Sequence, residues 1–88
     1  MRFKSQVYVP PMSKVSEMKE IDFDLENDLF CFRAVALLAE AGVIPHAAGF
    51  YGQSERVGGY DKDETTRTSV YNGDTRAFVG CVDFKWGS

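Results

Sequence analysis

The chain of 88 residues has few of the groups on which most catalytic and metal sites depend. It contains one histidine, two cysteines and no Cys-x-x-Cys pair. Zinc sites need several histidine, cysteine or carboxylate ligands at characteristic spacings, and two cysteines are too few for a disulfide framework. We therefore expect no metal and no other cofactor, and we interpret Cys31 and Cys81 as buried free thiols.

Long hydrophobic runs, repeats and low-complexity tracts are also missing from the sequence. No run of about 18 apolar residues is present, which excludes a membrane-spanning helix, and the basic first residues lack the apolar stretch of a secretory signal. The glycines at 52, 58 and 59 are not followed by the lysine and hydroxyl residue of a phosphate-binding loop. We expect a single cytoplasmic domain over residues 1–88.

The segment from Leu25 to Ala41 is apolar over most of its circumference when it is drawn as a helix. Its three apolar rows contain Leu25, Leu29, Phe32 and Ala36; Phe30, Ala34 and Leu37; and Cys31, Val35 and Leu38. We expect Asp24 to cap this helix, Asp28 and Glu26 to lie near its positive end, and Gly42 to end it. The apolar surface is wider than one small sheet covers, so either loops wrap the helix or it joins two copies into a homodimer.

Alternation of polar and apolar residues predicts strands at Arg2 to Val9, Ala47 to Val57, Thr65 to Tyr71 and Arg76 to Trp86. The pair Asn72-Gly73 predicts a tight type I′ hairpin. The polar stretch from Ser13 to Glu20 could form a short helix, because Val15 and Met18 are three residues apart, whereas the alternation from Ile21 to Asp24 could instead form a short strand. The expected fold class is α+β, an antiparallel sheet of three to four strands with one long helix packed on one face.

Acidic residues are concentrated from residue 17 to residue 28, where only Lys19 opposes them. This acidic strip consists of Glu17, Glu20, Asp22, Asp24, Glu26 and Asp28. Capping and the helix dipole explain part of the strip. The remaining negative charge favours a basic surface on a partner protein, with an ordinary solvated surface as the alternative.

The charge pattern leads to a first functional hypothesis, a non-enzymatic protein-binding module. The acidic strip, with tyrosines such as Tyr8, Tyr51 and Tyr60, would contact a basic protein surface, for example one that handles nucleic acid. Compact acidic chains without catalytic motifs occur among phage-encoded inhibitors of host enzymes, including anti-CRISPR proteins. We therefore expect a small inhibitor with a protein partner, and no direct contact with nucleic acid or a membrane.

A second hypothesis is a small enzyme or ligand-binding domain around His46. The histidine could act as a general base with Tyr51, Asp61 or Glu64 near the glycine-interrupted strand. No nucleophile motif accompanies it, so a surface histidine is the simpler interpretation. The run of carboxylates from Asp61 to Glu64 lacks the later ligands of a calcium loop and reads as a solvated turn.

A third hypothesis is a single-stranded nucleic-acid binder. Phe78, Phe84 and Trp86 alternate along the last strand and would stack on bases if they formed an exposed face. The net charge of −3 opposes a phosphate partner. Burial of these rings beneath the helix is the alternative.

Overall fold

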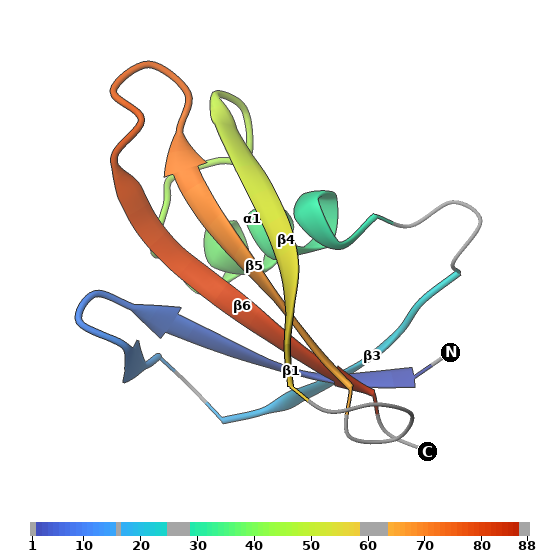
Figure 1. Cartoon of the computed structure of the whole chain (residues 1–88). Helices are drawn as coiled ribbons and strands as arrows, with labels where there is room; N and C mark the ends of the chain where they lie inside the picture. Colours follow the sequence, from blue (N-terminus) through green and yellow to red (C-terminus); the bar gives the residue numbers. More distant parts are fainter. Residues whose placement is uncertain (1, 16, 25–28, 59–63, 87–88) are drawn as a thin grey trace.

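The computed structural model describes residues 2–15, 17–24, 29–58 and 64–86. This part of the chain is an α+β fold in which the helix α1 (Phe30–Glu40) packs against a six-stranded antiparallel sheet (Figure 1). The strands are β1 (Arg2–Val9), β2 (Ser13–Lys14), β3 (Lys19–Asp22), β4 (Phe50–Gly58), β5 (Thr65–Asn72) and β6 (Phe78–Trp86). The expected class is confirmed, but the expected count of three to four strands is wrong because β2 and β3 add to it.

The strands are ordered β2-β1-β6-β5-β4, and β3 pairs with β1 beside β2. β2 pairs with the end of β1 at Tyr8 and Val9, whereas β3 pairs with its beginning, from Arg2 to Ser5. β3 therefore overlaps the strand expected from Ile21 to Asp24, β2 was not expected, and the described residues between Ser13 and Glu20 do not form the short helix. As a result β3 and β4 lie at opposite edges of the sheet.

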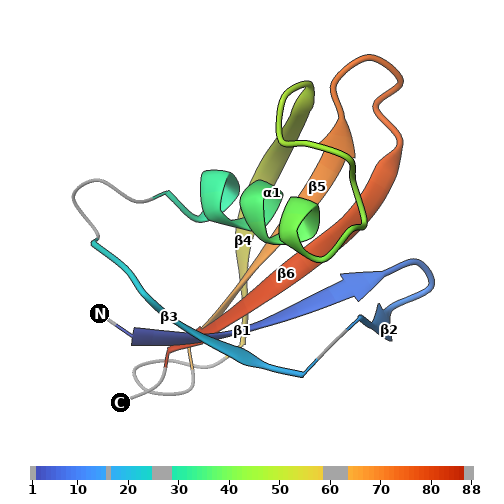
Figure 2. The same ribbon diagram turned by 180° about the vertical axis from the view of Figure 1, so that it is seen from behind.

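The helix covers one face of the sheet, as Figure 2 shows from behind. The core between them contains Leu38, Val70, Val82 and Phe84, all at 0 % exposure. Rings of Phe3, Phe23, Phe30 and Phe84 add an aromatic cluster with centroids 4.9 to 5.4 Å apart. We call the opposite side of the sheet the outer face; register places Gln6, Tyr8, Tyr51, Arg67, Tyr71 and Asp83 on it.

The two ends of α1 differ in how well the sequence predicts them. Leu29 is extended (φ −112°, ψ 138°) and is the N-cap, with no side-chain capping bond, so Asp24 does not cap the helix as expected. Residues 25–28, including Glu26 and Asp28, lie outside the described part. At the other end Gly42 adopts φ 77°, and Val43 N donates to Leu38 O at 3.0 Å in a Schellman arrangement. The glycine therefore ends the helix as predicted.

The hairpin between β5 and β6 is longer than the predicted two-residue turn. The Asn72 Oδ1 atom accepts bonds from the amides of Asp74 (2.8 Å) and Thr75 (3.0 Å). The Gly73 amide instead donates to Gly49 O at 2.7 Å, and Arg76 carries the positive φ of 63°. Asn72 thus organises the loop through its side chain rather than through a type I′ turn.

A register shift follows this loop. Val70 pairs with Gly80, whereas Tyr71 pairs with Phe78, so Val79 is an extra residue on β6. An extra residue reverses the alternation of side chains beyond it. Phe78 therefore lies on the outer face, whereas Phe84 and Trp86 share the core face as predicted, so the three β6 aromatics do not all lie on one face.

Within the described residues, α1 is too short to cross a bilayer, and no other helix is present that could do so.

Candidate functional site

The described members of the acidic strip lie along the β3 edge and are exposed. They are Glu17, Glu20, Asp22 and Asp24. Glu20 lies opposite Lys4, and Asp22 lies opposite Arg2. Basic residues of β1 therefore accompany the acidic residues of β3, and the strip is less one-sided than the sequence implies.

Two ion pairs at this edge are long and exposed to solvent. Arg2 Nη1 is 3.7 Å from Glu20 Oε2, and both side chains are more than half exposed. Lys19 Nζ lies 3.4 Å from Glu40 Oε1 on α1, again with exposed side chains. Such pairs contribute about 0 to 1 kcal/mol, so a partner can replace them at little cost.

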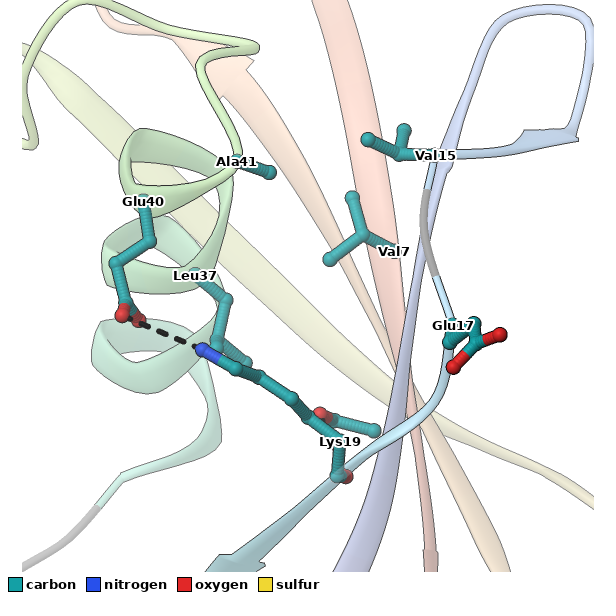
Figure 3. A pocket seen from close by; sticks show the side chains of 8 residues that line it. Val7, Val15, Glu17, Lys19, Leu37, Glu40 and Ala41 are labelled. Carbon is teal, nitrogen blue, oxygen red and sulfur yellow. Dashed lines mark hydrogen bonds and ion pairs between the residues drawn. The ribbon is translucent and has the colours of Figure 1, made fainter.

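A pocket of about 320 Å³ lies between α1, β1 and the segment that leads into β3 (Figure 3). Val7, Val15 and Leu37 contribute apolar surface to its lining, and Glu17, Lys19 and Glu40 contribute polar groups. The ion pair of Lys19 with Glu40 connects the β3 side of the pocket to α1. Because it includes Glu17 and Lys19, this pocket adjoins the acidic strip.

The tyrosines that the sequence associates with the acidic strip lie elsewhere. Tyr8 is half-buried at the far end of β1, opposite Cys81. Tyr51 is on β4, at the other edge of the sheet, and its ring stacks on Tyr71 with centroids 5.5 Å apart. Tyr60 falls outside the described residues. The structure thus keeps the β3 carboxylates together but separates them from Tyr51.

An aromatic row crosses three strands of the outer face. Tyr71 stacks on Tyr51 and meets the Phe78 ring edge-on, with a centroid distance of 5.8 Å. The sequence does not reveal this row, because Tyr51 and Tyr71 meet only through the β4–β5 register and Phe78 joins them only through the bulge.

The groups proposed for catalysis around His46 are not assembled in the described residues. His46 is exposed, and its Nδ1 atom is 3.0 Å from the carbonyl oxygen of Ala48 in its own loop. Asp61 lies outside the described part, and Glu64 forms an ion pair with Arg56 at 2.9 Å. Among the described residues, no three histidine, cysteine or acidic side chains are grouped to hold a metal.

The aromatic residues of β6 do not form a base-stacking platform. Phe84 is 0 % exposed in the core, and the half-buried Trp86 packs against the same core. Phe78 alone of the three is exposed, at 39 %, and it lies on the opposite face. The three rings therefore do not form the shared exposed face that the nucleic-acid hypothesis requires.

Both cysteines are free thiols, but only Cys81 is buried as expected, whereas Cys31 is half-buried. Cys81 is buried, with its Sγ 3.8 Å from Met12 Sδ. Burial, assisted by the Asp83 carboxylate and opposed by Arg67, raises the pKa of the Cys81 thiol. The protonated thiol is unreactive as a nucleophile or metal ligand.

A second pocket, of about 420 Å³, is apolar and lies between the start of α1 and residues 47–52. Cys31, Phe32 and Val35 form its helical wall. Phe32 is 70 % exposed, although it belongs to the apolar row of the helix. The excess of apolar helix surface was the signal in the sequence for this site.

Comparisons of the chain with protein family models, curated proteins and solved structures found no match.

Proposed function

We propose that this chain is a non-enzymatic protein-binding module that presents its β3 edge to a basic surface of a partner protein. The observation that carries the proposal is the exposure of all four described carboxylates of the acidic strip, at residues 17, 20, 22 and 24. They belong to an edge of the sheet where β3 pairs only with β1 in the described residues. A partner can approach this edge without displacing another strand.

The energetics of the edge favour binding to basic side chains. Arg2 and Lys4 lie opposite the β3 carboxylates, but the Arg2–Glu20 pair is exposed and 3.7 Å long. If an arginine of the partner takes the place of Arg2 beside Glu20, little desolvation free energy is lost, because the pair is already exposed. Complementary charges on the two surfaces also accelerate association. The binding should therefore weaken steeply as salt is added.

The same charge pattern supports the finer proposal of an inhibitory role. Carboxylates along an extended strand present negative charge to the lysines and arginines that otherwise bind phosphate groups. A protein that handles nucleic acid would then lose access to its substrate. The analogy with phage-encoded inhibitors is part of this proposal, and the capture experiment described next tests it as well.

The test is affinity capture from a nuclease-treated lysate of the source organism or its host. The variant Glu17→Gln/Glu20→Gln/Asp22→Asn neutralises the strip, and Glu55→Gln, an exposed acid on β4, is the matched control. We expect one stoichiometric protein to bind the wild type and the control, to be lost from the triple variant and to elute as salt rises above about 0.5 M. Circular dichroism should show all three proteins folded.

Two results would contradict the proposal. Equal capture by the triple variant would mean that the acidic strip is not the contact surface. The absence of any nuclease-resistant protein partner would remove the proposed function itself.

A further inference from the structure

The last turn of α1 carries an acid where helices usually carry a base. Glu40 is the final residue of the helix, and no basic residue lies in that turn. The carbonyl groups at the C-terminus of a helix give that end a partial negative charge, so a carboxylate there is unfavourable and a cation is favourable. Such breaks of a local rule are typical of functional sites. The surroundings of Glu40 therefore attract positive charge.

Lys19 supplies part of this positive charge from β3. Its Nζ atom lies 3.4 Å from Glu40 Oε1, and both side chains are more than half exposed. Figure 3 shows the lysine side chain extending from β3 across to Glu40 on α1. An exposed pair at this distance contributes little to stability, so another cation can displace it. The chain's own lysine also shows that a cation on an aliphatic stem fits beside this pocket.

Only the side chain of Lys19 has to move for such an exchange. The hydroxyl of Ser5 donates a hydrogen bond to the carbonyl oxygen of Lys19 at 3.1 Å, and the two residues are partners in the β1–β3 register. Ser5 itself is buried. The backbone of β3 therefore stays in place when the lysine side chain leaves Glu40.

The pocket beside the ion pair suits the aliphatic part of a basic side chain. Its volume of about 320 Å³ is at the lower end of the range for small-ligand sites. Val7, Val15 and Leu37 contribute apolar surface, on which the methylene groups of a long basic side chain can pack while its charged end remains near water. Glu17 also lines the pocket, but its carboxylate is turned away from α1 in Figure 3.

We propose that this pocket receives an arginine side chain of the partner protein, whose guanidinium replaces the Lys19 ammonium at Glu40. The inference rests on the proposed function and names the group of the partner that enters. A guanidinium can form two parallel hydrogen bonds with one carboxylate and is more weakly hydrated than an ammonium. It therefore binds Glu40 more strongly than Lys19 does at 3.4 Å.

The position of the pocket agrees with a basic partner surface. Glu17 belongs both to the pocket lining and to the acidic strip, so the pocket adjoins the edge that the partner approaches. An arginine anchored in a pocket and surrounded by weaker contacts is a common arrangement in protein interfaces, where few residues provide most of the binding free energy.

NMR titration with small probes tests the pocket in the absence of the partner. N-acetyl-arginine amide carries the proposed group, and N-acetyl-citrulline amide has nearly the same shape without the charge. We expect the arginine probe to bind with a dissociation constant of about 1 to 10 mM. It should shift the methyl signals of Val7, Val15 and Leu37, and the citrulline probe should leave them unchanged.

Two variants predict effects of opposite sign. Glu40→Gln should weaken binding of the arginine probe about tenfold or more, because the charged acceptor is lost. Lys19→Thr should strengthen it about two- to fivefold, because the competing cation is removed. Glu64→Gln is the matched control, since Glu64 also forms an ion pair, with Arg56 at 2.9 Å, but does not line the pocket. A purely structural Lys19–Glu40 pair predicts no gain from Lys19→Thr.

Three outcomes of the titration would overturn the inference. They are equal binding of the two probes, equal binding of the arginine probe by Glu40→Gln and the wild type, and weaker binding by Lys19→Thr. Circular dichroism should show every variant folded, because both substituted side chains of the pair are exposed.

Capture of the partner separates this inference from the proposed function. Glu40→Gln lies outside the acidic strip, and Glu20→Gln/Asp22→Asn lies outside the pocket; we expect each to reduce capture, and Glu64→Gln to leave it unchanged. Capture that depends on Glu20 and Asp22 but not on Glu40 would refute the arginine site and leave the proposed function intact. Binding of the arginine probe without any captured protein would instead overturn the proposed function, together with the partner as the source of the arginine.

Discussion

The guanidinium of Arg67 and the carboxylate of Asp83 form a bidentate ion pair between β5 and β6 on the outer face. The Nε–Oδ1 distance is 2.7 Å and the Nη2–Oδ2 distance is 3.0 Å. The two residues face each other directly in the register, and their side chains are 34 % and 17 % exposed. The hydrogen bonds to Asp83 raise the pKa of Arg67, so the guanidinium remains charged at every accessible pH.

Substitution of Asp83 by asparagine should destabilise the fold by about 1 to 3 kcal/mol, because it leaves a partly buried guanidinium without its charged acceptor. Urea unfolding followed by circular dichroism gives this free energy of unfolding. Glu20→Gln is the matched control, because the Arg2–Glu20 pair is exposed and should cost under about 1 kcal/mol. Equal losses in the two variants would show that the Arg67–Asp83 geometry has no special stabilising role.

The Cys81 thiol should react more slowly than Cys31. Burial raises the pKa of Cys81, so less thiolate is present near neutral pH, and the side chain is also less accessible than that of Cys31. Iodoacetamide labelling of the variants Cys31→Ser and Cys81→Ser, read by intact mass, measures each thiol separately. Faster labelling of Cys81 would contradict the buried position.

The same raised pKa predicts the direction of a pH effect on stability. As pH rises through the ordinary pKa of a thiol, the unfolded chain loses its proton before the folded chain does. The contribution of Cys81 to stability is therefore complete below that pH and is lost above it. The variant Cys81→Ala should show a smaller fall in the free energy of unfolding at alkaline pH than the wild type.

The stacked rings of Tyr51 and Tyr71 should be coupled energetically. Their centroids are 5.5 Å apart, and their planes differ by 25°, a geometry that contributes about 0.5 to 1.5 kcal/mol beyond area burial. A double-mutant cycle with Tyr51→Ala and Tyr71→Ala, measured by urea unfolding, isolates this coupling. Simple additivity of the two losses would mean that the rings touch without stabilising each other.

The elements that the sequence predicted well combine a clear period with a buried face. β1, β5 and β6 are close to their predicted bounds because one side of each strand enters the core. β3 has only Ile21 partly buried, so its pattern contains little periodicity. Its position as a strand is decided by pairing with β1, a long-range relationship that local patterns do not encode.

The candidate surfaces also divide into features that local sequence shows and features that depend on long-range strand pairing. The exposure of the β3 carboxylates follows from their charge, which the sequence displays directly. The position of Tyr51 at the opposite edge depends on strand order, and the reversal of Phe78 depends on one extra residue at Val79. A single-residue bulge has no distinctive composition here, so only the three-dimensional register reveals it.

The close contact of α1 with β4 at Gly52 should not tolerate a side chain. A Cβ atom at this position would lie 2.9 Å from Thr68 Cγ2, 3.0 Å from Cys31 Cβ and 3.1 Å from Cys31 Cα. The helix backbone would have to move away from the sheet, so Gly52→Ala should lower the free energy of unfolding by about 1 to 3 kcal/mol. Gln53→Ala, its exposed neighbour on β4, should change it by less than about 0.5 kcal/mol. Urea unfolding of both variants decides the matter, because equal stability would mean that α1 does not pack against β4 as closely as the structure places it.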